Sequence, residues 1–247
     1  GGEVGDRLKL IDFDHFGNNS FRVVSQLTIK GPQKSKRPDV VVEINGLPLI
    51  VVELKNPDDL NATIDSAFNQ IQTYKQDIPD LFIYNAFVII SDNIEAQMGG
   101  LVSPMERFCA WESVDGEQYR PYGHFQQLKT LTFGLLKPET LIKYLKTSIL
   151  FEKSATKAGD QTSSKKIAAY HQFFAIDALI ENVIKSKNDG SNKGGVVWHT
   201  QGSGKSLTMG LATSALMSHP KMENPTIIVV TDRNDLDGQL FETFSLM

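Results

Sequence analysis

Two strongly β-forming runs on either side of an Asn-Gly pair constrain this chain more than any other feature. PDVVVEI ends directly before Asn45-Gly46, and LPLIVVELK follows it. Both runs are rich in β-branched residues, and Asn-Gly is a strong signal for the tight turn of a β-hairpin. We therefore expect two antiparallel strands here, at the centre of a sheet.

Three ionisable residues lie at the end of this largely apolar hairpin that is remote from the Asn-Gly turn. Asp39 follows Pro38 at the start of the first run, and Glu53 and Lys55 lie at the end of the second. Burying an unpaired charge among valines is costly, so a bound metal explains the trio well. For Mg²⁺-dependent phosphodiester hydrolysis, Asp39 and Glu53 would hold Mg²⁺ and Lys55 would activate the attacking water. The alternative is a Glu53–Lys55 ion pair on an edge strand.

The register of the hairpin decides whether the two carboxylates share a face. Side chains alternate along a strand, so Glu53 and Lys55 lie on the same face. A regular two-residue turn would pair Asp39 with Val52 and place the carboxylates on opposite faces. A three-residue turn with a bulge brings them together, and Gly46 can take the left-handed conformation that such a bulge needs. We therefore predict a bulged hairpin.

Recognisable patterns also lie outside the hairpin. Residues 21–30, FRVVSQLTIK, and residues 86–91, AFVIIS, are typical of strands. Between them, apolar residues recur at helical spacing from about Asn61 to Lys75. After a second expected hairpin around Asp115-Gly116, residues 136–150 predict a helix with a proline in its first turn. The first domain is therefore expected to combine α and β elements.

A polar run, EKSATKAGDQTSSKK, separates this part from the rest of the chain. Its composition predicts a mobile linker over 153–166, between a first domain over 1–152 and a second over 167–247. Strands and helices are expected to alternate in the second domain, which indicates a parallel sheet: helix 167–186, strand 195–199, helix 205–218 and strand 226–231.

The second domain contains a phosphate-loop motif, HTQGSGKS, in which His199 replaces the usual first glycine. Glycines at 202 and 204 let backbone N–H groups curl around phosphates, with Ser203 between them. Lys205 would reach the terminal phosphates and the Ser206 hydroxyl would coordinate Mg²⁺. The expected strand before the loop and helix after it support an ATP site.

These motifs occur in an order that resembles the motor subunit of type I restriction enzymes. PD, ELK and a QxxxY element formed by Gln70 and Tyr74 resemble its PD-(D/E)xK nuclease domain. WHTQGSGKS resembles motif I of superfamily 2 translocases, and KKIAAYHQFFAI resembles the adenine-reading segment, with Gln172 on the adenine edge and Tyr170 beside it. IIVVTDRNDLDGQL resembles the DNA-contacting segment, through Thr231, Asp232 and Arg233.

The resemblance implies a fold and a function. The fold would be a PD-(D/E)xK domain with a mixed sheet, followed by the start of a RecA-like P-loop domain with a parallel sheet. The function would be Mg²⁺-dependent cleavage of double-stranded DNA coupled to ATP-driven translocation, with methyltransferase and specificity subunits as partners. Two alternatives are a RecB-like repair nuclease–helicase and a non-catalytic DNA clamp or docking module.

Composition sets limits on these readings. The net charge of -4 argues against a DNA-coating protein, so DNA would bind to local patches such as Lys34, Lys36 and Arg37. The single cysteine, Cys109, excludes an intrachain disulfide and fits a reducing compartment. No apolar run is long enough to span a membrane, so we expect a cytoplasmic protein.

Overall fold

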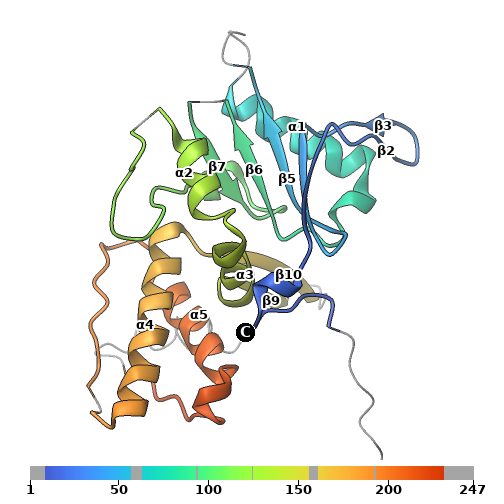
Figure 1. Ribbon diagram of the computed structural model, residues 1–247. Coiled ribbons are helices and arrows are strands. Elements are labelled where there is room, and N and C mark those ends of the chain that lie inside the picture. The colour runs from blue at the N-terminus through green and yellow to red at the C-terminus, as the bar shows by residue number, and fades with distance from the viewer. Residues whose placement is uncertain are drawn as a thin grey trace, which may run out of the picture.

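A six-stranded mixed sheet forms the centre of the computed structural model, which describes residues 9–56, 63–92, 94–123, 125–155, 161–191 and 193–230. The strand order is β1-β4-β5-β6-β7-β8, and only the central β5–β6 pair is parallel. Figure 1 shows this sheet in the upper half of the molecule. Its strands are β1 (Phe21–Ser25), β4 (Val40–Ile44), β5 (Leu47–Leu54), β6 (Phe87–Ser91), β7 (Ala96–Gly99) and β8 (Cys109–Ala110).

One face of the sheet is covered by helix α1 (Ile64–Asp77). Thr63 caps this helix by accepting from the Ser66 backbone N–H, and Ser66 reciprocates, which satisfies two exposed donors of the first turn. Ala67 and Ile71 then pack with Val41 and Val51 from the sheet. The expected helix is thus confirmed, a few residues later than its pattern suggested.

The opposite face is covered by α2 (Gln127–Gly134) and α3 (Pro138–Thr147). Pro138 occupies the first turn of α3, where its missing N–H costs nothing, as the sequence predicts. The valines of β4 and β5 divide between the two faces because side chains alternate: Val42 and Val52 pack towards α2 and α3, and Val41 and Val51 towards α1.

The predicted strand over residues 21–30 is interrupted. β1 ends at Ser25, Gln26 takes a positive φ of 54°, and a short hairpin of β2 (Ile29–Lys30) and β3 (Ser35–Lys36) follows. Short 3-10 turns lie at Phe16–Asn18, Pro79–Phe82, Met105–Arg107 and Pro220–Met222. The hairpin expected around Asp115-Gly116 is reduced to one bridge, between Ser113 and Tyr119.

The predicted mobile linker is wrong in its conformation. β9 (Ile149–Ala155) and β10 (Gln161–Ile167) pair in a regular antiparallel register from Ile149 opposite Ile167 to Ala155 opposite Gln161. Ile149 and Ile167 pack against the core, and Glu152 pairs with Lys166 at 3.3 Å. The segment is polar in composition, but it forms a two-stranded ribbon that contacts the core at the end where Ile149 and Ile167 pair.

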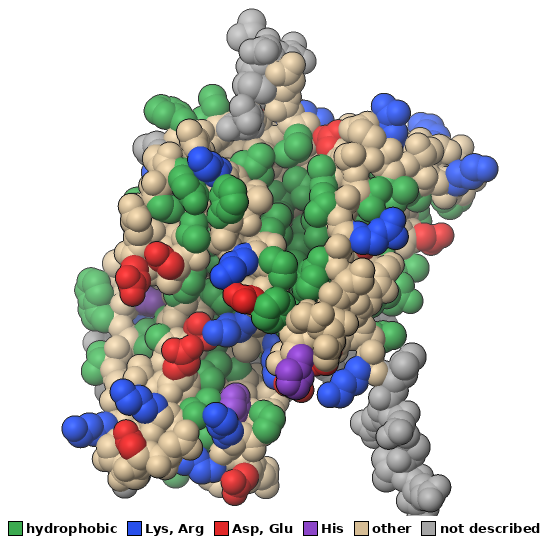
Figure 2. Space-filling view, viewed as in Figure 1, with side chains coloured by type: hydrophobic (Ala, Val, Ile, Leu, Met, Phe, Trp, Pro, Cys, Tyr) green, Lys and Arg blue, Asp and Glu red, His purple; other side chains and the backbone are tan. Residues whose placement is uncertain are grey.

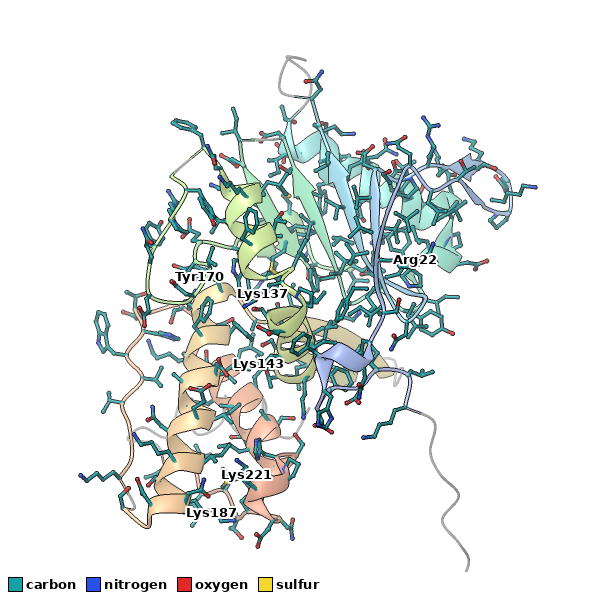
Figure 3. The ribbon with its side chains drawn as sticks, viewed as in Figure 1. Arg22, Lys137, Lys143, Tyr170, Lys187 and Lys221 are labelled. Carbon is teal, nitrogen blue, oxygen red and sulfur yellow. The ribbon has the colours of Figure 1, made fainter. Side chains whose placement is uncertain are left out.

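Helices α4 (Tyr170–Asp189) and α5 (Lys205–Met217) pack against α3, so the two predicted domains share one apolar layer. The rings of Trp111, Tyr144 and Phe173 lie 5.6–5.7 Å apart within it. The buried Tyr144 hydroxyl donates to the Ala168 carbonyl at 2.6 Å. Lys143 on α3 reaches the Asp177 carboxylate on α4 at 2.7 Å (Figure 3). The two parts are therefore joined by packing as well as by the chain.

The parallel sheet predicted for the second domain is not formed in the described part of the chain. Residues 195–199 and 226–230 have no strand ladder, and Val196 and Trp198 are 94% and 81% exposed. A strand requires a hydrogen-bonded neighbour, and neither segment has one there. None of the described helices is long and apolar enough to cross a membrane.

Candidate functional site

The β4–β5 hairpin places Asp39 and Glu53 on the same face. The turn contains two residues, Asn45 and Gly46, with φ angles of 53° and 81° that suit a tight hairpin turn. Leu49 is the extra residue of a bulge, since Val42 pairs with Ile50 and Glu43 with Pro48. The predicted bulge is confirmed, but the predicted three-residue turn is wrong, because the turn has two residues and the extra residue lies inside β5.

As a result of this bulge, Val40 lies opposite Val52. The residues one step further out, Asp39 and Glu53, therefore face each other across the hairpin on the side of Val41 and Val51. This side is the one that α1 covers. Strand pairing within one hairpin thus fixes the relative position of the two carboxylates.

Asp39 is held by hydrogen bonds from Gln26, directly after β1, and from Leu54 at the end of β5. Its Oδ1 accepts from Gln26 Nε2 at 2.8 Å, and its Oδ2 accepts from the Leu54 backbone N–H at 2.9 Å. The Gln26 N–H also donates to the Asp39 carbonyl at 2.9 Å. Gln26 is a positioning residue that the sequence did not reveal, because its role depends on a left-handed backbone that glutamine rarely adopts.

Glu53 is the most buried ionisable group of the site, at 3% exposure. Its Oε1 accepts from Lys55 Nζ at 2.7 Å, and its Oε2 has no hydrogen-bond partner among the described residues. Burial raises the pKa of the Glu53 carboxyl, and the Asp39 charge raises it further against the opposing effect of Lys55. A buried carboxylate oxygen without a partner is costly and is well suited to a cation.

Lys55 lies just beyond β5, where its backbone N–H donates to the Ser91 carbonyl of β6 at 2.8 Å. This bond continues the parallel β5–β6 pairing by one residue and fixes the start of the Lys55 side chain. The ammonium group is half-buried and is held against the Glu53 carboxylate. The alternative of a surface Glu53–Lys55 pair does not fit the burial of Glu53.

Helix α1 brings Tyr74 to the same place. Tyr74 is 5% exposed, and its pKa is raised by burial and by the neighbouring Glu53 charge. Gln70 lies one turn earlier on α1 and is half-buried, and its side chain has no hydrogen-bond partner in the described residues. The structure therefore brings Tyr74 to Asp39 and Glu53, which we call the acidic pair, and places Gln70 one turn away on the same helix.

The donor set fits Mg²⁺ bound mainly through substrate and water. Asp39 and Glu53 supply two carboxylates, and the described residues contain no cluster of three or more metal-binding side chains. Mg²⁺ commonly binds through one or two carboxylates plus phosphate oxygens, whereas Zn²⁺ needs a fuller set of nitrogen and sulfur ligands. The unpartnered Glu53 Oε2 is the clearest open ligand position.

The phosphate-loop motif forms a tight turn into α5. Gly202 and Gly204 have φ angles of 80° and 79°, a conformation that glycine adopts at no cost, and α5 begins at Lys205. Lys205 Nζ donates to the carbonyls of His199 and Thr200 at 2.9 and 2.7 Å. Ser206 follows in the first turn of the helix and is half-buried.

Gln172 supports this loop from α4. It is 5% exposed, its Nε2 donates to the carbonyls of Ser203 and Gly204, and its Oε1 accepts from the Ala169 N–H. A methyl group on Gly204 would lie 2.6 Å from Gln172 Nε2, so the loop and α4 fit closely. Tyr170 lies two residues earlier, at the start of α4. The predicted DNA-contacting residues Thr231, Asp232 and Arg233 lie outside the described residues.

Comparisons with known proteins agree with the motif order. Residues 1–107 match the family model of the type I restriction enzyme R protein N terminus. Residues 171–247 match the SWI2/SNF2 ATPase family model.

Curated relatives match nearly the whole chain. The HindI endonuclease subunit of Haemophilus influenzae is 45% identical over 243 residues, which is 97% of this chain and 23% of the relative. The putative MjaIXP endonuclease subunit of Methanocaldococcus jannaschii is 33% identical over 260 residues, or 96% and 24% of the two chains. The chain thus spans about a quarter of the length of these relatives, both of which are named as type I restriction enzyme subunits. Residues 1–107 therefore belong to the family of the type I restriction enzyme R protein N terminus, and nearly the whole chain is similar to type I restriction enzyme endonuclease subunits.

Proposed function

We propose that the first domain, residues 1–152, hydrolyses phosphodiester bonds of double-stranded DNA with Mg²⁺ held by Asp39 and Glu53. The observation that carries this proposal is the unpartnered Glu53 Oε2, buried beside Lys55 on the face that Asp39 shares. A carboxylate pair with one adjacent ammonium supplies what metal-assisted hydrolysis needs: ligands for the metal and a cation near the nucleophile.

The bound metal would polarise the scissile phosphate and lower the pKa of a coordinated water. The protein's own groups have distinct tasks. Gln26 and the Leu54 N–H hold the Asp39 carboxylate in a fixed orientation. Lys55 orients the attacking water and offsets charge that develops on the phosphate. Tyr74 lines the side of the site formed by α1, with Gln70 one turn away on the same helix.

We further propose that residues 167–247 bind ATP and Mg²⁺ as the opening part of a translocase. Gly202, Ser203 and Gly204 would surround the phosphates, Lys205 would neutralise their charge, and Ser206 would ligate Mg²⁺. For this, Lys205 must exchange its bonds to the His199 and Thr200 carbonyls for bonds to phosphate oxygens. Gln172 would then hydrogen-bond both the loop and the edge of the adenine.

The similarity to these relatives supports a place for this chain in a larger enzyme. The relatives are named as endonuclease subunits of type I restriction enzymes. By that relation we propose that the whole protein cleaves DNA after ATP-driven translocation, as the motor subunit of a restriction-modification system. Methyltransferase and specificity subunits would be its partners, and the cytoplasm its location.

Cleavage by the intact subunit, assembled with its partners, tests the nuclease assignment. Asp39→Ala, Glu53→Ala or Lys55→Ala should abolish DNA cleavage and leave ATP hydrolysis nearly unchanged, since the two sites are separate. Glu43→Ala is the matched control, because Glu43 lies on β4, which Asp39 directly precedes, but pairs with Arg22 at the other end of the hairpin. Normal cleavage by Lys55→Ala would instead support a non-catalytic clamp.

The ATP assignment has its own test. Lys205→Ala in the intact subunit should abolish ATP hydrolysis, because Lys205 is the one cation in the loop 199–206 apart from the titratable His199. DNA cleavage should then fail indirectly for lack of translocation. Full ATP hydrolysis by this variant would remove the translocase proposal and leave the nuclease proposal standing.

A further inference from the structure

Residues 29–37, which contain β2, β3 and Arg37, form a cationic projection that we call the basic hairpin. Lys30, Lys34 and Arg37 are exposed, and their side chains have no ion-pair or hydrogen-bond partner in the described part of the chain. Figure 2 shows Lys and Arg side chains gathered over β2 and β3 at the upper right. In a chain of net charge -4, three unpaired cations in eight residues are a local excess of positive charge.

The basic hairpin emerges from the end of the sheet that carries the acidic pair. It is inserted between β1 and β4, so that Gln26 precedes it and Asp39 follows it. Leu27 and Ile29 pack against the core on the α1 side. The cations therefore lie on the same side of the sheet as Glu53.

The basic hairpin is fixed to α1 through its turn and through β3. The Gly31 N–H donates to the Lys34 carbonyl at 3.0 Å, and Lys36 pairs with Asp77 at the end of α1 at 3.1 Å. A methyl group on Gly31 would lie 1.7 Å from the Asp77 carbonyl oxygen, so the backbone of the hairpin packs directly against the backbone of α1. A merely solvated loop requires no such fit. The same helix carries Tyr74, so the cations and the site are held in one rigid unit.

From these contacts we infer that the basic hairpin binds the phosphate backbone of double-stranded DNA beside the bond that is cut. The inference rests on the proposed nuclease function and adds the surface that places its substrate. Lys30, Lys34 and Arg37 supply unpaired donors for phosphate oxygens, and Lys36 serves as the anchor. Lysine contacts to phosphate position a duplex without reading its sequence, so this surface contributes no base specificity.

The test compares two double variants of equal charge in the intact, assembled enzyme. Lys30→Gln/Lys34→Gln alters the basic hairpin, and Lys129→Gln/Lys137→Gln alters exposed cations on the α2–α3 side of the sheet, where Figure 3 labels Lys137. Single-turnover cleavage is measured at saturating ATP between 50 and 200 mM salt. Each phosphate contact contributes a slope of about 0.9 to the log–log salt dependence.

The basic-hairpin variant should therefore cleave more slowly at low salt, with a slope shallower than that of the unaltered enzyme by about 1.8. The ratio of the unaltered enzyme's cleavage rate to that of the basic-hairpin variant should therefore fall about 12-fold between 50 and 200 mM salt. This factor is the fourfold change in salt raised to the power of about 1.8. The control variant should match the unaltered enzyme in rate and slope. Equal rates and slopes for the two double variants would overturn the inference, even if Lys55→Ala abolishes cleavage as the nuclease proposal requires.

A photo-crosslinking residue at position 34 gives a readout independent of catalysis. In the Lys55→Ala background it should crosslink to DNA, whereas the same residue at position 137 should not. A crosslink from position 34 to a partner subunit and not to DNA would overturn the inference and make the basic hairpin a docking surface. If position 34 crosslinks to DNA but Lys55→Ala cleaves normally, the nuclease proposal fails and the DNA-binding surface stands.

Discussion

Removing the Lys55 side chain should destabilise the metal-free protein because it leaves the Glu53 carboxylate buried and alone. The two groups are 2.7 Å apart, and their side chains are 22% and 4% exposed. At an effective dielectric constant of about 20, their attraction is about 6 kcal/mol before desolvation. Loss of one partner of a buried pair costs about 3–5 kcal/mol, and the partial exposure of Lys55 reduces this to about 2–3 kcal/mol for Lys55→Met.

The expected loss depends on pH in a defined direction. Burial raises the pKa of Glu53 above its unfolded value, so the native state holds its proton more tightly and stability falls as pH rises through that raised pKa. Without Lys55 the pKa rises further. The destabilisation by Lys55→Met should therefore be largest at about pH 8. It should be nearly absent at about pH 4, where the Glu53 carboxyl is mostly protonated in both the folded and the unfolded protein.

Urea unfolding in EDTA at the two pH values measures this, with Glu53→Gln/Lys55→Met completing a double-mutant cycle. The double variant should recover most of the stability, because it contains no unpaired charge. A loss that is the same at both pH values, or a double variant as unstable as Lys55→Met, would refute the electrostatic reasoning. The penalty would then come from packing of the lysine stem.

One further prediction concerns the packing between the two predicted domains, and another concerns the phosphate loop. Tyr144→Phe should lower the free energy of unfolding by about 1–3 kcal/mol in urea, because the buried Ala168 carbonyl loses its donor; an unchanged midpoint would contradict this. Gly204→Ala should weaken ATP binding measured by calorimetry, since the residue has a φ of 79° and the added methyl group would displace the Gln172 amide 2.6 Å away. Gly123→Ala has the same backbone strain, at φ 87°, with no neighbour within 4 Å, and should bind ATP normally.

The central hairpin and the grouping of Asp39, Glu53 and Lys55 at one end of it were predictable from the sequence because the signals are local. β-branched runs around Asn45-Gly46 determine the strands, and a bulge follows from the requirement that Asp39 and Glu53 share a face. The bulge lies at Leu49 and not in the turn, since an Asn-Gly pair favours two residues and the extra residue is absorbed within β5.

Other features depend on contacts that no local pattern encodes. Gln26 orients Asp39 only because its backbone is left-handed. The polar segment before Ile167 forms a ribbon because its apolar end packs on the core. Val196 and its neighbours have strand-like composition, but composition does not supply a hydrogen-bonded neighbour.

Metal binding at the acidic pair is the central property of the proposed nuclease site, and Mn²⁺ offers a direct measurement because it shares the oxygen-ligand preference of Mg²⁺. Crystals of the protein soaked in Mn²⁺ should give an anomalous difference peak in contact with carboxylate oxygens of Asp39 and Glu53. The peak should disappear in Glu53→Gln crystals treated in the same way. A protein saturated with Mn²⁺ that shows no peak between these two side chains, or an unchanged peak in Glu53→Gln, would contradict the proposed nuclease site.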